Sequence, residues 1–174
     1  DSERIFETIA SIMVSPNFEY DLEEYREGSP YTTIFRGPKN GLGNLGWIDN
    51  EHIYFQSEAT GFSHIYTAHV STGVKKQLTS GNWEVRSLRL SNDKKKFYFI
   101  GSKEHPGITH YYSISTDGQN MTQITQMKGG NEVIMSPDEK WLAIRYSYIN
   151  KPWELYLQEN KPGAKAIQIT ESPT

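Results

Sequence analysis

The sequence predicts an all-β fold, a partial β-propeller of about three four-stranded antiparallel blades with an irregular N-terminal segment. Its clearest feature is a repeat with three markers. The tripeptide Gln-(Leu/Ile)-Thr starts at residues 77, 123 and 168, a Ser-x-Asp-x-Lys turn starts at 91 and 136, and an apolar triplet starts at 53, 97 and 142. The markers share a period of about 45 residues, which is typical of propeller blades that each contain four strands.

The composition of the 174 residues favours the same fold class. Aromatic residues make up 13% of the chain, and 14 Gly and 8 Pro interrupt it at short intervals. This mixture suits short strands joined by tight turns. A single sheet can bury both of its faces only by stacking on other sheets. The burial stabilises the fold by roughly 25 cal/mol per Å² of apolar area, so one blade is not expected to fold alone. Closed propellers have about four to eight blades, so three leave the ring open.

Residues 1–40 lack the Ser-x-Asp turn and the Gln-Ile-Thr ending, and we expect an N-terminal extension or an incomplete blade there. Residues 5–14 fit one helical face or a strand of an incomplete blade. The acidic stretch 16–30 predicts a solvated loop, because no calcium-loop pattern surrounds it. Residues 41–46 spell G-x-G-x-x-G, but a dinucleotide site requires a helix next. The repeat continues there instead, which predicts a flexible inter-strand loop.

The three blades are expected at about residues 41–81, 82–127 and 128–174. Turn-forming residues and apolar runs divide each blade into strands. The predicted strands are 53–57, 64–70 and 74–79 in the first blade, 85–90, 97–100, 109–114 and 121–125 in the second, and 142–148, 153–157 and 166–170 in the third.

Charge and hydropathy exclude several classes of protein. With 18 Lys+Arg against 21 Asp+Glu the formal net charge is −3, whereas nucleic-acid binders usually carry a basic excess. No run approaches the roughly 20 apolar residues of a membrane span, and no secretory signal is visible. The chain has no cysteine, which excludes disulfides, thiol catalysis and cysteine-bound zinc.

The chain shows no complete reaction centre, and we expect no catalytic residue, metal site or cofactor. Ser63 lies in Gly-Phe-Ser-His-Ile, which lacks the second glycine of a G-x-S-x-G nucleophile turn. We expect His64 to pack or bond within the sheet. The five histidines show no H-E-x-x-H spacing, which excludes a helical zinc site.

Two segments resemble a known family. SEATGFSHIY at residues 57–66 and KQLTSGNWEV at 76–85 resemble the propeller of dipeptidyl peptidase IV-like serine peptidases in the prolyl oligopeptidase family. The resemblance covers about residues 47–170. It implies a C-terminal portion of a seven- or eight-bladed propeller that filters peptides for an α/β-hydrolase domain with a Ser-Asp-His triad. No triad motif is present, so the resemblance implies that the parent protein is the serine-type exopeptidase and this chain its non-catalytic part.

Further expectations follow from the resemblance. Trp83, Glu84 and Arg86, at the entry of an inner strand, are candidates for lining the substrate channel or pocket. The partners would be a peptide substrate and the parent's α/β-hydrolase domain, with a homodimer as a further option, and the compartment periplasmic or extracellular. The family holds the substrate's N-terminus with a Glu-Glu pair. Glu23-Glu24 has that identity but lacks the family's flanking pattern, so the role is not transferred to it.

Two alternatives remain open at the sequence level. The first is a free-standing propeller that acts as a protein-interaction scaffold, which closes by itself or by pairing with a second copy. The second is a carbohydrate-acting propeller, in which carboxylates such as Glu58, Glu84 and Glu132 would converge on a central pocket.

Overall fold

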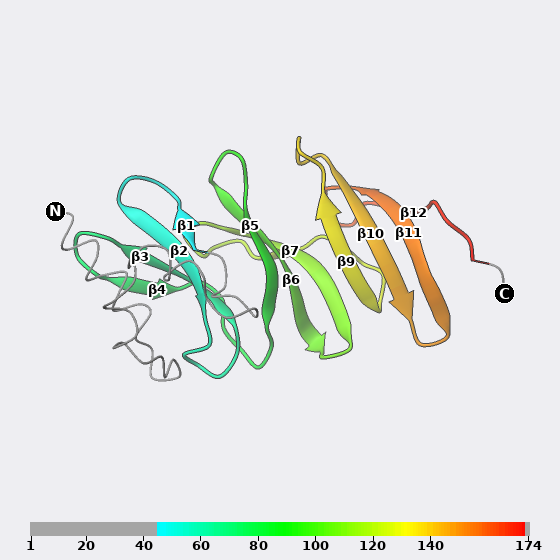
Figure 1. Cartoon of the computed structure of the whole chain (residues 1–174), viewed down its shortest axis with the longest axis horizontal. Helices are drawn as coiled ribbons and strands as arrows, with labels where there is room; N and C mark the ends of the chain where they lie inside the picture. The colour runs from blue at the N-terminus through cyan, green and yellow to red at the C-terminus, as the bar shows by residue number, and fades with distance from the viewer. Residues whose placement is uncertain (1–44, 173–174) are drawn as a thin grey trace, which may run out of the picture. The chain divides into compact units, whose positions relative to one another are not determined.

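The computed structural model describes residues 45–172, and within that range the chain forms three four-stranded antiparallel sheets (Figure 1). The first sheet contains β1 (Gly46–Trp47), β2 (His52–Ser57), β3 (His64–His69) and β4 (Lys75–Gln77). The second contains β5 (Val85–Leu90), β6 (Lys96–His105), β7 (Ile108–Ser115) and β8 (Thr122–Gln123). The third contains β9 (Gly130–Met135), β10 (Trp141–Tyr148), β11 (Lys151–Glu159) and β12 (Ile167–Gln168). In each sheet the strands lie in chain order, which confirms the predicted all-β partial propeller.

The chain divides into two compact units, residues 1–79 and residues 80–174. The first unit contains the sheet β1–β4, whose buried core consists of Ile53, Phe55, Ala68 and Val70. Phe55 and Tyr66 stack across β2 and β3 with their ring centroids 5.5 Å apart.

The prediction of a loop at residues 41–46 is wrong for its last residue, Gly46. Gly46 and Trp47 form β1 and pair with Tyr54 and Ile53. A Cβ at Gly46 would lie 2.7 Å from the Tyr54 ring, so the glycine makes room for that ring beside the strand. No helix follows, because the chain turns directly into β2, in agreement with the rejection of a dinucleotide site. Residues 1–44, which include Glu23-Glu24 and the earlier glycines, lie outside the described residues.

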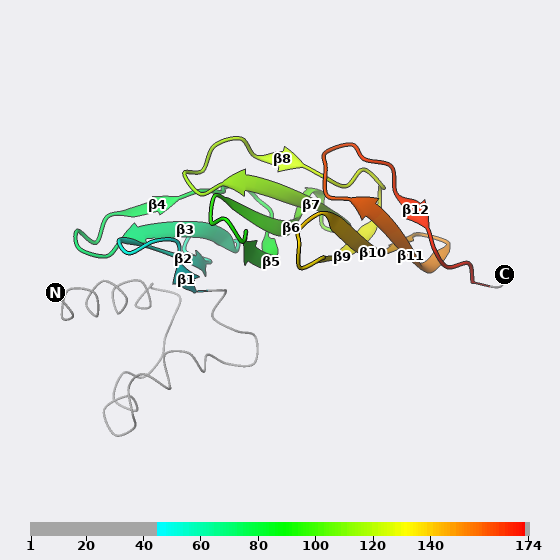
Figure 2. The same ribbon diagram turned by 90° about the horizontal axis from the view of Figure 1, so that it is seen from above.

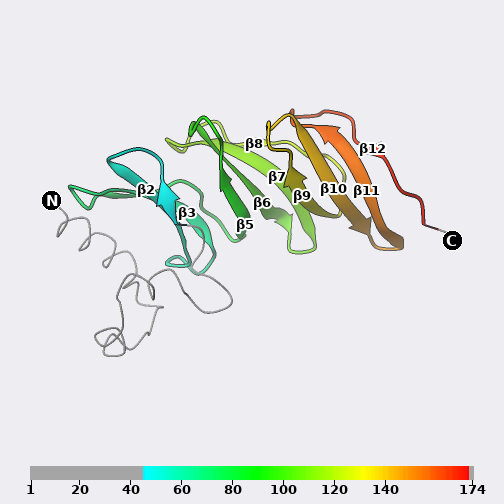
Figure 3. The ribbon, with the colours of Figure 1, turned by 45° about the horizontal axis from the view of Figure 1, so that its top comes forward.

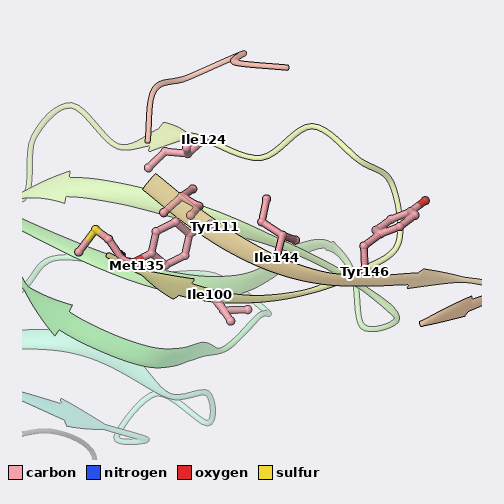
Figure 4. Packing of buried hydrophobic residues seen from close by; sticks show 7 residues of the cluster. Ile100, Tyr111, Ile124, Met135, Ile144 and Tyr146 are labelled. Carbon is pink, nitrogen blue, oxygen red and sulfur yellow. Dashed lines mark hydrogen bonds between the residues drawn. The ribbon is translucent and has the colours of Figure 1, made fainter. Parts of the chain in front are cut away.

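The second unit consists of two sheets, β5–β8 and β9–β12, which lie side by side (Figures 1 and 3). One buried cluster joins them (Figure 4), made of Ile100, Tyr111 and Ile124 from the second sheet and Met135, Leu142, Ile144 and Tyr146 from the third. Leu142 and Ile144 are fully buried. Face-to-face burial of this kind is the main source of stability for stacked sheets.

Polar contacts supplement the apolar cluster between these two sheets. The Asn131 side-chain amide donates to Thr109 O at 2.6 Å and to Met127 O at 2.8 Å. Gln158 Nε2 donates to Ile124 O at 3.3 Å. Buried amides that satisfy neighbouring carbonyls fix how the two sheets dock, because an unmade buried hydrogen bond is costly.

The Gln-(Leu/Ile)-Thr marker ends the short outer strands β4, β8 and β12 (Figure 2). In the second sheet Thr125 Oγ1 accepts the Tyr111 amide at 2.9 Å, and the Gln123 side chain donates to Thr125 O at 2.9 Å. The threonine hydroxyl thus takes the place of a ladder carbonyl, which is why the observed outer strands are shorter than predicted. Thr79 and Thr170 make the equivalent contacts with Ile65 and Leu155.

The repeated Ser-x-Asp turn is held by its own side chains. Asp93 Oδ1 accepts from Ser91 Oγ at 2.7 Å and from the Lys95 amide at 3.0 Å, and Asp138 does the same in the third sheet. The residue after each aspartate has a positive φ, 59° at Lys94 and 62° at Glu139. Each turn therefore uses a left-handed position that glycine would occupy at lower cost.

Candidate functional site at the start of β5

The predicted residues Trp83, Glu84 and Arg86 occur where the chain enters β5, the first strand of the second sheet. Trp83 is buried, its indole N–H donates to Ser80 O at 2.9 Å, and its ring stacks on Phe99 at a centroid distance of 6.2 Å. Phe99 stacks in turn on Tyr112 at 5.6 Å. Within this chain Trp83 therefore anchors the entry to β5.

Two glycines make room for the Trp83 ring. A Cβ at Gly81 would lie 2.6 Å from the indole nitrogen, and a Cβ at Gly101 would lie 3.1 Å from the ring and 3.2 Å from the Tyr112 ring. Gly81 also has a φ of +123°, a conformation that side chains rarely adopt. The Ser-Gly-Asn-Trp segment therefore enters the sheet in one well-packed backbone conformation.

Glu84 and Arg86 form an exposed ion pair beside this anchor, with Arg86 Nη2 2.9 Å from Glu84 Oε2. The structure thus brings these two predicted residues together and buries the third. Exposed pairs of this kind stabilise a fold by only about 0–1 kcal/mol. The sheet therefore has little structural need for the pair, and both charges are accessible to a ligand.

A cluster around His110 was not predicted from the sequence. His110 is buried, with Nδ1 3.2 Å from Thr125 Oγ1 and Nε2 4.0 Å from Glu104. Glu104 also lies 3.5 Å from Lys128 Nζ. Burial lowers the pKa of His110, although the Glu104 charge opposes the shift. The His110–Thr125 contact repeats that of His64 with Thr79, whereas no sequence spacing reveals the approach of Glu104 and Lys128.

A second cluster, which lies on the third sheet, was also not predicted from the sequence. Arg145 donates to Glu132 from Nε at 2.7 Å, and its guanidinium carbon lies 4.8 Å from the centroid of the Trp153 ring. Glu132 and Arg145 are direct cross-strand partners. Glu84 and Glu132 therefore each form an ion pair with an arginine on the surface of their sheet, and they do not converge on one pocket with Glu58.

The Ser63–His64 dipeptide does not form a nucleophile and base. Ser63 Oγ accepts from Gln56 Nε2 at 3.0 Å, whereas His64 is fully buried with Nδ1 3.1 Å from Thr79 Oγ1. The prediction that His64 bonds within the sheet is confirmed. His64 and His110 occupy the same repeat position, and Glu154 takes it in the third sheet. Hydrogen bonds from Thr170 and Ser172 lower the pKa of the Glu154 carboxyl.

Other kinds of site were sought among the described residues. Across residues 45–172 no group of three or more His, Asp or Glu side chains lies close enough to hold a metal ion. In the same part of the chain no helix is long and apolar enough to cross a membrane. A cavity of about 240 Å³ lies in the second unit and is lined by residues such as Lys96, Tyr98, Ser113 and Asn160. None of the three predicted site residues lines it.

Three consecutive four-stranded sheets with a 45-residue repeat define a segment of a β-propeller. Residues 44–153 match the family model of the Dipeptidyl peptidase IV (DPP IV) N-terminal region. The chain belongs to this family, and the resemblance seen in the sequence is confirmed.

Individual relatives agree with this assignment. The probable dipeptidyl peptidase 4 of Arthroderma benhamiae and the dipeptidyl peptidase 4 of Trichophyton rubrum are each 33% identical over 148 residues, which are 75% of this chain and 19% of theirs. The crystal structure of Porphyromonas gingivalis dipeptidyl peptidase 4 superimposes with a TM-score of 0.59 at 24% identity, over 73% of this chain and 18% of that one. The last similarity concerns the fold alone. The chain spans about a fifth of the length of the curated relatives it matches.

Proposed function

We propose that this chain is the non-catalytic propeller portion of a dipeptidyl peptidase IV-like serine peptidase, and that it positions peptide substrates for a hydrolase domain. The observation that carries the proposal is the match of residues 44–153 to the DPP IV N-terminal region. The names of the relatives support an exopeptidase as the parent protein. Location in the periplasm or outside the cell stays a prediction.

The Glu84–Arg86 pair is the proposed substrate contact. An exposed carboxylate suits the protonated N-terminus of a peptide, and an exposed guanidinium suits carbonyl or carboxylate oxygens through paired hydrogen bonds. Trp83 fixes the backbone that carries both charged residues, because its ring packs against Phe99, Gly81 and Gly101. Placement on an anchored strand entry keeps the charges at fixed positions, which a binding site requires.

The test combines binding with hydrolysis. Titration of the purified chain with short peptides that have a free N-terminus, followed by NMR, should show binding that Glu84→Gln with Arg86→Gln weakens by at least about tenfold, a typical loss for a charge-assisted contact. Glu159 and Lys161 offer a matched control, since they form a pair of opposite charges two residues apart at 2.7 Å that is also exposed. Their Gln variants should bind like the wild type.

Three results would overturn the proposal. Equal peptide affinity for both pairs of variants would remove the role of Glu84 and Arg86. Hydrolysis of dipeptidyl-proline amides by the purified chain, abolished by Ser63→Ala, would show that the chain is itself catalytic. If the chain binds a folded protein and no peptide, the interaction-scaffold alternative replaces the proposed function.

A further inference from the structure

The cavity of about 240 Å³ in the second unit lies against one end of the sheet β5–β8. Strand register sets Lys96 on β6 opposite Ser115 on β7, and Tyr98 opposite Ser113. Ser113 is also the partner of Thr122 on β8. Cross-strand partners lie on the same face of a sheet, so these five side chains, all of which line the cavity, form one continuous wall.

This wall continues the face that packs on the third sheet, but its chemistry changes along the strands. Two residues beyond Tyr98, Ile100 is opposite Tyr111, and both belong to the buried apolar cluster between the two sheets. In the other direction the serine side chains are much smaller, which leaves space where the apolar cluster ends. Asn160 and Pro162, from the connection between β11 and β12, line the cavity as well.

The size of the cavity limits what it can bind. Sites for drug-sized ligands usually measure about 300–1,000 Å³, so a cavity of about 240 Å³ suits a smaller molecule. The two sheets beside it are held together by the buried cluster and by hydrogen bonds such as that from Gln158 to Ile124 O. The cavity therefore lies within one compact unit and keeps its shape.

The charge of the lining favours an anion. Lys96 is exposed and is the one charged residue among those that line the cavity. Two carboxylates near Tyr98, those of Asp93 and Glu139, each accept a backbone amide in a neighbouring turn. An ammonium group that meets a carboxylate or phosphate forms a charge-assisted hydrogen bond, which is stronger than one between neutral groups.

The neutral groups of the lining add donors for the same anion. Ser113 and Ser115 carry hydroxyl groups, which rotate to donate to an oxygen atom. Burial raises the pKa of Tyr98, so the phenol keeps its proton at neutral pH and can also donate. Several hydroxyl donors beside one cation are the groups that a carboxylate needs on its two oxygen atoms.

Asn160 supplies an acceptor on the opposite side. Its Nδ2 donates to Glu139 O at 2.8 Å, which fixes the orientation of the amide, because the flipped amide would place two oxygen atoms against each other. The Asn160 Oδ1 atom is buried and has no hydrogen-bond partner among the described residues. A buried acceptor without a partner is unfavourable, and an N–H group of a ligand is the partner that it lacks.

We infer that this cavity binds a small organic carboxylate, whose charge pairs with Lys96 and whose neighbouring N–H group donates to Asn160 Oδ1. The hydroxyl groups of Ser113 and Ser115 donate to the carboxylate, and the carbon atoms of the ligand contact Pro162. The inference is independent of the proposed function, because neither Glu84 nor Arg86 lines the cavity.

Titration of the purified chain with N-acetylglycine, followed by NMR, tests the inference. This probe is small and carries a carboxylate one carbon atom from an N–H group, and N-acetylglycinamide is its neutral analogue. We expect saturable shifts of the Ser113, Ser115 and Thr122 amide signals with N-acetylglycine. The neutral analogue should bind at least about tenfold more weakly, because it loses the charge-assisted contact.

Variants of the lysine locate the charge. Lys96→Gln should weaken the binding of N-acetylglycine by at least about tenfold, and Lys96→Arg, which keeps the positive charge, should retain most of the affinity. Lys95→Gln is the matched control, since Lys95 is the adjacent exposed lysine and does not line the cavity. It should bind like the wild type.

The outcomes separate clearly, since all three substitutions lie at exposed positions and the NMR spectrum of each variant shows whether it folds. No saturable shift at millimolar N-acetylglycine would overturn the inference, and so would equal affinities for N-acetylglycine and its amide. Equal losses for Lys95→Gln and Lys96→Gln would remove the role of Lys96. Tighter binding of inorganic phosphate than of N-acetylglycine would show that the carboxylate assignment is wrong.

Discussion

Replacement of Thr125 by valine tests the repeat marker directly. Thr125 is fully buried, and its Oγ1 accepts the Tyr111 amide at 2.9 Å and lies 3.2 Å from His110 Nδ1. Valine keeps the shape and removes the oxygen. Each buried polar group left without a partner costs about 1–3 kcal/mol, and here two are affected. We expect Thr125→Val to lower the free energy of unfolding by about 2–6 kcal/mol.

Thr170 provides the matched control in the third sheet. Its Oγ1 accepts the Leu155 amide at 2.9 Å and donates to the Glu154 carboxylate, but Thr170 itself is exposed. Water can replace the lost oxygen there, so Thr170→Val should cost less than Thr125→Val. Thr125→Ser keeps a hydroxyl and should also lose less than Thr125→Val.

Equilibrium urea unfolding measures all three variants against the wild type, and a shift of the midpoint at constant slope reports the change in stability. Measurement at two protein concentrations separates folding from association. Thr125 and Thr170 lie in the same compact unit, so their effects refer to the same transition. Equal losses for the two valine variants, or a Thr125→Val protein as stable as the wild type, would refute the reasoning.

Three further predictions follow from the second unit. Gly101→Ala should lower the free energy of unfolding by about 1–3 kcal/mol in urea titrations, because the new Cβ meets the Trp83 ring at 3.1 Å; Gly107→Ala, with its nearest atom at 3.4 Å, should be near neutral. Lys94→Gly should raise the thermal midpoint, since it relieves a φ of 59° and gains about 0.5–1 kcal/mol; an unchanged or lower midpoint would contradict this. Burial lowers the pKa of His110, so the unfolded chain takes up this proton more readily. Its contribution to stability is full above pH of about 6.5 and decreases as the pH falls below that value; His110→Gln should flatten the stability profile between about pH 5 and 7, and an unchanged slope would contradict the assignment.

Much of the fold could be predicted because the repeated motifs form contacts between residues that are close in sequence. The Ser-x-Asp turn closes through its own side chains, so its sequence alone marks a hairpin. The Gln-(Leu/Ile)-Thr marker also forms a local contact, from the Gln123 side chain to Thr125 O. These contacts span a few residues and recur with each period, which is why the strand order was evident without the structure.

Strand lengths were harder to predict, for reasons visible in the pairings. The apolar run 97–100 predicted a short strand, whereas β6 extends to His105. The polar residues beyond Gly101 continue the ladder with β7 after a register shift and reach a pairing of His105 with Ile108. Backbone hydrogen bonds hold this exposed hairpin together, and the hydrophobic pattern of the sequence does not indicate them.

The surroundings of the three candidate residues could be predicted only in part. The sequence placed Glu84 and Arg86 at a strand entry, and the structure pairs them on the surface. It did not reveal that Trp83 is buried, because an aromatic residue beside two charges suits a lined channel as well as a packed anchor. The ring's environment depends on Phe99 and Gly101, which reach it only through the register of β5 and β6.

The sequence by itself determined the period, the turns, the four-stranded unit and the family of this protein, because each rests on contacts within a few residues or on motifs read in order. Only the tertiary structure decided which side chains meet across strands, such as Glu132 with Arg145, and which face of the third sheet packs against the second. Inner strands of stacked sheets are apolar on both sides, so alternation cannot distinguish the covered face from the exposed one. That choice depends on what packs against the sheet, and packing is a property of the folded chain.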